Sequence, residues 1–392
     1  MKNKGNERWL RLGLGCVILL VAGLIYAWSI LNKPLQSSFD KTQLSFCFTL
    51  TLCFFCLGGL VSGLISNKVS IFNRMVMAAV LTGIGFILSA VHRNSLWILY
   101  LGYGVMAGSG IGIVYNTVIS ATNAWFPDKK GLCSGALMMT FGFSALLFGK
   151  LADSLFQVPS FGWQRTYQLL GGIAAVVFIA GAWLLKMPEK KAGPAAQDND
   201  NDVPTREMIK KASFWKLFVF FTLLAAVGSA AIGFGKDYFM SVGLAEGAAV
   251  TVAGLLSIFN GLGRIFSGMA FDKLGLRKAQ ILTSAVAILS PALALIAIVL
   301  HAGFLGVIGL CLCGFTYGFS PTMSAALVSA FYGGKYFPLN FPVLNLVLIP
   351  ASFSSTLAGA LVTASGSYLS TFVVLTVLSV IGLAVNLSIK KA

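Results

Sequence analysis

Acidic residues are scarce in this chain, which has 12 Asp and Glu among 392 residues, against 28 Lys and Arg. All twelve lie in predicted loops or at the ends of apolar segments, so no carboxylate is expected inside an apolar segment. Histidine is scarcer still, and its two residues, His92 and His301, also lie at segment ends. The composition therefore offers no buried acidic partner for a cation, and neither of the two groups that commonly relay protons inside membranes.

The residue patterns of metal, cofactor and catalytic sites are also missing. All seven cysteines fall within apolar segments, and the single CxxC, Cys53 and Cys56, has no His or carboxylate at ligand spacing. We therefore predict neither a metal site nor a disulfide framework, and no cofactor. No Walker A motif and no arrangement of nucleophile, base and orienting group is present, so the chain is not expected to be an enzyme or to use ATP directly.

What the sequence does contain is apolar length, with 57% hydrophobic and 10% charged residues. Repeated apolar runs of about 20 residues are typical of a protein that crosses a lipid bilayer many times. The net charge of +16 would suggest nucleic acid in a soluble protein. Here the basic residues adjoin apolar segments, and no basic face with stacking aromatics lies outside them, so nucleic-acid binding is not expected.

Charged and turn-forming residues divide the chain into twelve apolar segments. Each is long enough to cross about 30 Å of hydrocarbon as a helix. The sequence therefore predicts an all-α integral membrane protein with twelve transmembrane helices. The segments are 9–31, 43–66, 75–91, 96–125, 132–152, 166–185, 213–235, 248–271, 279–300, 304–332, 341–364 and 367–388.

The loops alternate in charge along the chain. Basic pairs such as Lys68 with Arg74, and Lys129 with Lys130, fall on the same side as both termini, whereas the opposite loops carry isolated charges. By the positive-inside rule both termini are cytoplasmic, and we expect a monomer in the plasma (inner) membrane. The polar stretch 187–212 cannot bury a core, so it is interpreted as a cytoplasmic linker between six-helix bundles at 1–186 and 213–392.

An internal repeat supports two related bundles. GLISNK (63–68) matches GMAFDK (268–273) at an offset of 205, and AWFPDKKG (124–131) lies opposite AFYGGKYF (330–337) at an offset of 206. Repeated halves are typical of transporter folds, whose substrate site lies near the midplane where the halves meet. Under this offset Arg264 corresponds to Gly59, so the arginine is not part of the repeat.

Arg264 is the charged residue placed deepest in an apolar segment. Its nearest acidic residue, Asp272, is eight positions away, roughly 12 Å at helical rise. A charge at that depth costs a few kcal/mol or more unless it meets a cavity, a partner or an anion. An anionic substrate, held by two parallel hydrogen bonds, would supply the missing charge, and Asn260 on the same helical face could donate to it. The alternative is an arginine bonded to backbone carbonyls in a packed interface.

Four aromatic side chains are candidates for lining a small cavity, where their rings would seal it and tyrosine hydroxyls would donate to a ligand. Packing alone explains each of them equally well. They are Tyr26, Tyr115, Phe141 and Tyr317.

Four stretches give the chain a family resemblance: GLIYAWSILNKPL (23–35), GIGIVYNTVISATNAWFPDKKGLCSGA (110–136), FNGLGRIFSGMAFDKLGLRK (259–278) and FYGGKYFPLNF (331–341). They resemble the major facilitator superfamily, and within it the oxalate–formate antiporters and related monocarboxylate transporters. The resemblance implies two six-helix bundles that alternate in access. It also implies gating roles for Asp272, Arg277 and Lys278, whereas Asn67 stands where the first half usually has an Asp.

The same resemblance places Arg264 on the family's carboxylate-binding arginine, and Tyr26, Tyr115 and Tyr317 on aromatic positions of its cavity. The oxalate carrier has a second cation, a lysine, where Leu348 aligns here, and Asn345 replaces a nearby aromatic residue. One cation suits one carboxylate, because a second negative charge would be poorly compensated in the cavity. We therefore expect a small monocarboxylate such as lactate, formate, acetate or pyruvate rather than oxalate.

Other functions remain open from the sequence. Without an intramembrane carboxylate or histidine, anion exchange or facilitated diffusion is favoured over proton-linked transport, which stays possible if the proton travels with the substrate or through Asp237. A rival is an exporter of a neutral solute or drug, in which Arg264 is bonded to the protein. Another is a membrane nutrient sensor that signals through 187–212.

Overall fold

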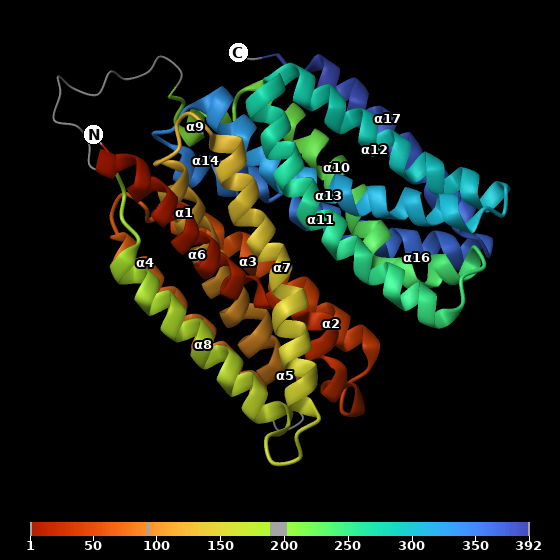
Figure 1. The fold of residues 1–392 in the computed structure, drawn as a ribbon, viewed down its shortest axis with the longest axis horizontal. Coiled ribbons are helices and arrows are strands. Elements are labelled where there is room, and N and C mark those ends of the chain that lie inside the picture. The colour runs from red at the N-terminus through yellow and green to blue at the C-terminus, as the bar shows by residue number, and fades with distance from the viewer. Residues whose placement is uncertain (1, 92–94, 189–201, 391–392) are drawn as a thin grey trace. The chain divides into compact units, whose positions relative to one another are not determined.

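A computed structural model describes residues 2–91, 95–188 and 202–390, and every regular element in that part of the chain is helical (Figure 1). The chain forms two compact units. The first unit comprises Met1–Asp128, Thr140–Asp202 and Gly334–Val343, and the second comprises Lys129–Met139, Val203–Gly333 and Leu344–Ala392. The bundle limits at 186 and 213 stay a prediction, and the linker falls largely on 189–201, outside the described residues.

The helices before the linker pack in pairs, with α4 running along α8 and α3 along α6 (Figure 1). Short 3-10 helices (η1, η2) and a π-helix (η3) interrupt the first and fourth spans. The elements are α1 (Lys2–Ala22), η1 (Gly23–Ala27), α2 (Trp28–Leu31), η2 (Lys33–Ser37), α3 (Lys41–Leu64), α4 (Ile71–Ala90), α5 (Leu96–Leu99), η3 (Tyr100–Ala107), α6 (Gly108–Asn123), α7 (Lys130–Phe156) and α8 (Gly162–Leu184).

After the linker, α13 is the central helix, because α10, α11 and α12 all pack against it, while α17 packs on α12 and α10. The elements are α9 (Thr205–Met208), α10 (Ala212–Ser241), α11 (Glu246–Leu274), α12 (Leu276–Val299), α13 (Gly303–Tyr332), α14 (Phe337–Asn345), α15 (Leu348–Ser352), α16 (Ser354–Ser365) and α17 (Tyr368–Ser388).

Eleven helical segments among the described residues are long and apolar enough to cross a membrane. Each coincides with one of the twelve predicted spans, which confirms those eleven as helices of suitable length and composition. The remaining predicted span, 248–271, lies within α11, a helix of 29 residues. The architecture is thus that of an all-helical protein built to lie in lipid, where helices satisfy their own backbone groups.

The first span and the span over 337–365 each contain a break in the α-helix. The first span changes from α-helix to 3-10 helix at Gly23–Ala27, and the hydroxyl of Tyr103 donates to the Ile25 carbonyl at 3.5 Å. The Tyr167 hydroxyl donates to the Leu31 carbonyl at 2.8 Å. The span over 337–365 breaks after Asn345. At the broken first span, the Tyr167 hydroxyl thus satisfies the carbonyl at the end of α2, where lipid offers no donor.

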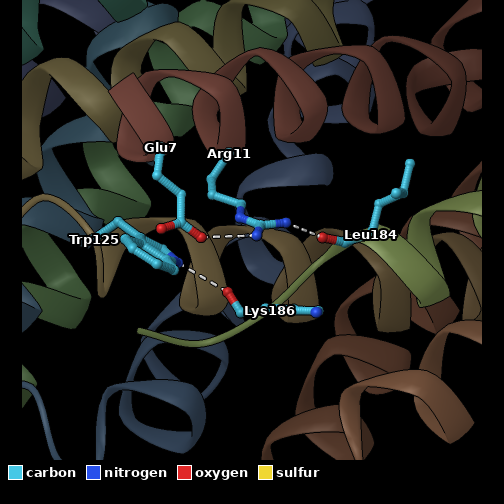
Figure 2. Close-up of polar contacts among 5 residues, drawn as sticks. All are labelled: Glu7, Arg11, Trp125, Leu184 and Lys186. Carbon is cyan, nitrogen blue, oxygen red and sulfur yellow. Dashed lines mark hydrogen bonds and ion pairs between the residues drawn. The ribbon is translucent and has the colours of Figure 1, made fainter. Parts of the chain in front are cut away.

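A group of polar contacts holds the end of α8 in the first unit (Figure 2). Arg11 donates to the Leu184 carbonyl and to the Glu7 carboxylate, the latter at 2.9 Å. The indole of Trp125 donates to the Lys186 carbonyl at 2.8 Å. Because these donors come from α1 and from the loop after α6, they fix the direction in which the chain leaves α8.

One basic residue lies elsewhere than predicted. Arg74 was expected in a loop, but α4 begins at Ile71, and Arg74 is inside the helix with 6% of its surface exposed. The reason is a helix cap, because the Ser70 hydroxyl accepts from the Asn73 amide at 3.1 Å and starts the helix earlier than hydropathy suggests.

Candidate functional site

Arg264 lies in α11 and is 2% exposed. Its Nη1 donates to the backbone carbonyl of Met138, and its Nε donates to Asn260 Oδ1 at 3.3 Å. Both acceptors are uncharged, and none of the ion pairs found among the described residues includes Arg264. The predicted burial is therefore present, and within the described part of the chain the positive charge is met by neutral oxygens alone.

The Met138 carbonyl reaches Arg264 because the start of α7 lies very close to α11 within the second unit. A Cβ built on Gly135 would lie 2.7 Å from the Arg264 carbonyl oxygen. A Cβ on Gly268 would lie 2.2 Å from the Gly131 carbonyl oxygen, so only glycine fits there. Small residues at 131, 135 and 268 thus set the backbone distance that the arginine bridges.

Asn260 has a described role toward Arg264, since its Oδ1 accepts from Arg264 Nε. Donation by its Nδ2 group to a ligand stays a prediction. Since the two residues are one helical turn apart, this bond holds the guanidinium along the face of α11. The backbone-carbonyl contact that the sequence left as an alternative is present too, as the bond to Met138.

A guanidinium can donate five hydrogen bonds in a planar fork, and the described contacts of Arg264 use Nε and Nη1. A carbonyl offers a partial charge, whereas a carboxylate offers a full one and two oxygens in the matching geometry. A carboxylate would therefore be a stronger acceptor for this group than the Met138 carbonyl is.

Three predicted aromatic residues form one aromatic cluster in the first unit. Phe141 lies at its centre, with its ring centroid 5.3 Å from that of Tyr26 and 4.9 Å from that of Tyr115. Two residues that the sequence did not single out, Phe55 and Phe341, complete the cluster at 5.1 Å and 6.3 Å from Tyr115. The structure thus brings together residues from five separate spans.

The broken first span explains why Tyr26 belongs to this cluster. A Cβ on Gly23 would lie 2.0 Å from the Phe141 carbonyl oxygen, so η1 and α7 touch through their backbones. Tyr26, three residues later in the same 3-10 helix, then packs edge-on against the Phe141 ring. No sequence pattern predicts this contact, because it joins residues more than a hundred positions apart.

The other two predicted site residues lie in the second unit. Tyr317 packs with Leu348 against the buried Ala225, Ala226 and Ala351, which makes an apolar patch. The described contacts thus place Tyr317 in a different group from Arg264. Asn345 ends α14 at the break in that span and is 6% exposed.

Asp272 and Arg277, predicted to act in gating, each bind a helix end within the second unit. The Asp272 carboxylate accepts from the amides of Gly131 at 3.1 Å and Leu132 at 2.8 Å, where α7 begins. Arg277 donates to the carbonyls of Asn386 at 3.1 Å and Leu387 at 3.0 Å, where α17 ends. A negative charge at the start of α7 and a positive charge at the end of α17 both interact favourably with the helix dipole.

Lys278, the third predicted gating residue, is exposed, and no hydrogen bond or ion pair of its side chain is described. The repeat partner of Asp272 is Asn67, also exposed and also without a described hydrogen bond. The backbone approach around it is nevertheless repeated, since a Cβ on Gly63 would lie 2.5 Å from the Pro338 carbonyl oxygen. The two halves thus repeat the close packing, but within the described contacts only Asp272 adds a charged cap.

Elsewhere the described residues show little that resembles another ligand site. Within them, no three His, Cys, Asp or Glu side chains lie close enough to hold a metal ion. A small cavity in the second unit is lined by residues of α10, α12 and α17 and includes none of the predicted site residues. Its lining is Phe220, Leu223, Leu224, Ser284, Ala287, Ser379 and Gly382.

Comparisons with known proteins place these features in a family. The sequence profile of the Major Facilitator Superfamily matches residues 10–338. The chain is 28% identical over 349 residues to the uncharacterized MFS-type transporter YhjX of Escherichia coli (strain K12), covering 88% of this chain and 85% of that protein. It is 26% identical over 386 residues to the oxalate:formate antiporter of Oxalobacter formigenes, covering 97% and 90%. With mouse monocarboxylate transporter 11 it shares 27% over 208 residues, covering 51% and 44%.

Solved structures agree on the fold. The Major Facilitator Superfamily transporter FucP in the outward conformation matches with a TM-score of 0.73 at 12% identity, covering 98% of this chain and 100% of that one. A bacterial homologue of the iron transporter ferroportin matches with a TM-score of 0.73 at 18% identity, covering 96% and 98%. Since the family profile spans most of the sequence, the chain belongs to the Major Facilitator Superfamily and is a multi-pass membrane transporter of that family.

Proposed function

We propose that this transporter carries small monocarboxylate anions, such as lactate, formate, acetate or pyruvate, by alternating access. The two named relatives that move small anions, the oxalate:formate antiporter and monocarboxylate transporter 11, support an anionic substrate. The proposed substrate contacts are Arg264, Asn260, Tyr26, Tyr115, Tyr317, Phe141 and Asn345.

The burial of Arg264 without an acidic partner carries the proposal. A cation with 2% exposure is expensive, and the neutral oxygens of Met138 and Asn260 compensate only part of its charge. A monocarboxylate compensates it fully. Leu348, on an apolar patch with Tyr317, offers no second charge, which argues against a dicarboxylate.

The test is uptake of radiolabelled monocarboxylate into liposomes that contain the purified protein. Arg264→Gln removes the charge and its fork of donors, and two lost charge-assisted hydrogen bonds of about 1.5 kcal/mol each imply roughly a 100-fold fall in kcat/KM. Arg264→Lys keeps the charge without the fork and should keep part of the activity. Arg165→Gln is the matched control, because Arg165 is exposed and bonded to the Ser160 carbonyl.

One observation favours a second function, export of a neutral solute. The guanidinium of Arg264 already has a protein acceptor in Met138, so it can be stabilised without any anion. In that case neither the wild type nor Arg264→Gln would bind a carboxylate. Arg264→Gln would transport the true substrate nearly as well as the wild type does. A thermal-shift screen of small carboxylates on the wild-type protein, with no ligand raising the unfolding temperature, would favour this second function.

We propose anion exchange as the coupling mode, with proton-linked transport as the alternative, because no carboxylate or histidine lies inside a predicted span. Liposomes loaded with a monocarboxylate should take up label by exchange. Uptake driven by an inward pH gradient into empty liposomes would instead establish proton coupling. We further propose a monomer in the plasma (inner) membrane with both termini in the cytoplasm.

A further inference from the structure

Arg74 and Arg264 are the only two charged side chains that the structure buries among its described residues. Arg74 is the fourth residue of α4, in the first unit, and is 6% exposed. The proposed function makes no use of it. A buried arginine that no acid compensates needs its own explanation.

The described partners of Arg74 are weak. Its Nη1 lies 3.5 Å from both the carbonyl oxygen and the hydroxyl of Ser62, at the limit of a hydrogen bond. Its Nε is buried and has no hydrogen-bond partner within the described residues. None of the described ion pairs includes it. Arg74 is thus less well compensated than Arg264, which has a carbonyl at short range and an amide oxygen at 3.3 Å.

The hydroxyl that approaches this guanidinium, that of Ser62 on α3, is itself paired with a hydroxyl of α6. The Ser62 hydroxyl lies 3.0 Å from Thr117 Oγ1, and both side chains are buried. Besides Thr117, the part of α6 that follows Tyr115 of the aromatic cluster carries other buried polar side chains. They are Asn116, Ser120, Thr122 and Asn123.

A run of buried polar groups is expensive in a helix that packs inside a membrane protein, and in transporters such groups mark the paths of ions and polar substrates. Asn116 is fixed by its bond to the Pro338 carbonyl at 2.9 Å, whereas the Thr122 hydroxyl is buried with no described partner. Thr117, two residues after Tyr115 of the aromatic cluster, therefore links α6 to Ser62, the described partner of Arg74.

We propose that Arg74, with the hydroxyls of Ser62 and Thr117, forms a second binding site for a small monovalent anion in the first unit, separate from Arg264. The guanidinium supplies the positive charge, and each of the two hydroxyls can donate one hydrogen bond to the anion. A carboxylate group or a halide is small enough to accept from both. The site does not depend on the proposed substrate role of Arg264, because its residues and unit are different.

A purely structural role gives a contrasting expectation. The Ser62 carbonyl is among the last four of α3, and a cation there stabilises the end of a helix. If Arg74 only caps α3, replacing it lowers stability equally in every salt. If it binds an anion, its contribution depends on which anion is present.

The experiment measures thermal unfolding of the full-length protein carrying Arg264→Gln, so that the first site is removed. Chloride, acetate or a bulky sulfonate is titrated at constant ionic strength. We expect chloride or acetate to raise the unfolding temperature and the sulfonate not to. Adding Arg74→Gln should abolish the rise, whereas adding Arg165→Gln should leave it unchanged.

The two small anions distinguish the source of the ligand. A rise with acetate alone assigns the site to carboxylates, and a rise with chloride assigns it to small monovalent anions in general. If Arg74→Gln does not fold, Thr117→Val keeps the arginine and should weaken the apparent affinity by about tenfold. An equal rise in unfolding temperature with and without Arg74 would overturn the proposed site. No rise in Arg264→Gln, or an unchanged anion affinity in Thr117→Val, would overturn it too.

These outcomes also separate this site from the proposed function. Loss of carboxylate uptake in Arg264→Gln, with no anion-dependent stabilisation left, would support the transport proposal and reject the second site. If Arg264→Gln keeps both the anion-dependent stabilisation and normal uptake, the second site is supported and the transport proposal is rejected.

Discussion

The contact between Asp272 and the first turn of α7 gives the most direct test of what holds the start of this helix. Asp272 accepts from the amides of Gly131 and Leu132 at 3.1 and 2.8 Å. Those amides belong to the predicted first bundle, 1–186, and Asp272 to the predicted second, 213–392. In the structure both sides of the contact lie in the second unit, so it fixes the start of α7 to α11, and its strength should set how often this end of α7 opens.

The change to make is Asp272→Asn, which keeps the side-chain shape and one acceptor oxygen but removes the charge. A hydrogen bond to a charged group is worth about 1.5–3 kcal/mol, and the helix dipole adds about 0.3–1 kcal/mol. Because Asp272 is exposed, solvent screens both terms, and one neutral bond survives. We therefore expect a net loss of about 1–2 kcal/mol, which is a factor of roughly 5–30 in the opening equilibrium.

Amide hydrogen exchange reads this equilibrium directly, because the Gly131 and Leu132 amides exchange when the contact is open. In Asp272→Asn, a peptide covering 129–135 should exchange roughly 5–30 times faster than in the wild type. Asp153→Asn is the control, since Asp153 forms an exposed ion pair with Lys33 at 2.8 Å. Exchange within twofold of the wild type in Asp272→Asn would refute the argument that this carboxylate holds α7.

Three further substitutions test the packing and the site. Gly263→Ala places a Cβ 2.1 Å from the Phe315 carbonyl oxygen and should lower the free energy of unfolding by about 1–3 kcal/mol, as measured by thermal unfolding. Gly359→Ala, whose Cβ would have nothing within 4 Å, should not. Equal unfolding temperatures in the two variants would contradict this packing. Asn260→Ala removes one acceptor of the Arg264 guanidinium and should raise the KM for a monocarboxylate about tenfold. It should also lower the unfolding temperature, because a buried donor loses its partner. An unchanged KM would exclude a positioning role. Leu348→Lys adds a second cation and should shift liposome uptake from monocarboxylates toward dicarboxylates, whereas the uncharged replacement Leu348→Met should not. An unchanged preference in Leu348→Lys would count against a charge-matched site.

Hydropathy was enough to find the spans, because a helix that must cross lipid needs about 20 apolar residues in a row. Burial of Arg264 followed from the same argument. The structure packs Tyr26 and Tyr115 around Phe141, and the prediction that these residues line a small cavity stays a prediction. What the resemblance adds, a role for each residue, stays a prediction.

The partners of the buried arginines could not be read from the sequence. The Met138 carbonyl and Arg264 are 126 positions apart, and a backbone carbonyl leaves no trace in the residue type. Arg74 was misplaced because hydropathy treats a charged residue near a span as part of a loop. The signal that would have corrected this was Ser70 as a helix cap, a local pattern that hydropathy does not include.

The first ten residues of α7 that belong to the second unit are held by α11 in two places. Asp272 binds the amides at the start of this segment, and Arg264 binds the Met138 carbonyl near its end. The two contacts differ in what can replace them. Nothing in the proposed cycle competes for the carboxylate of Asp272, whereas a substrate carboxylate would compete with Met138 for Arg264, because both need the same donor and the anion compensates more charge. Substrate binding would then release one of the two contacts and leave the segment held by Asp272 alone, so the energy that the anion gains at Arg264 would be available to move α7.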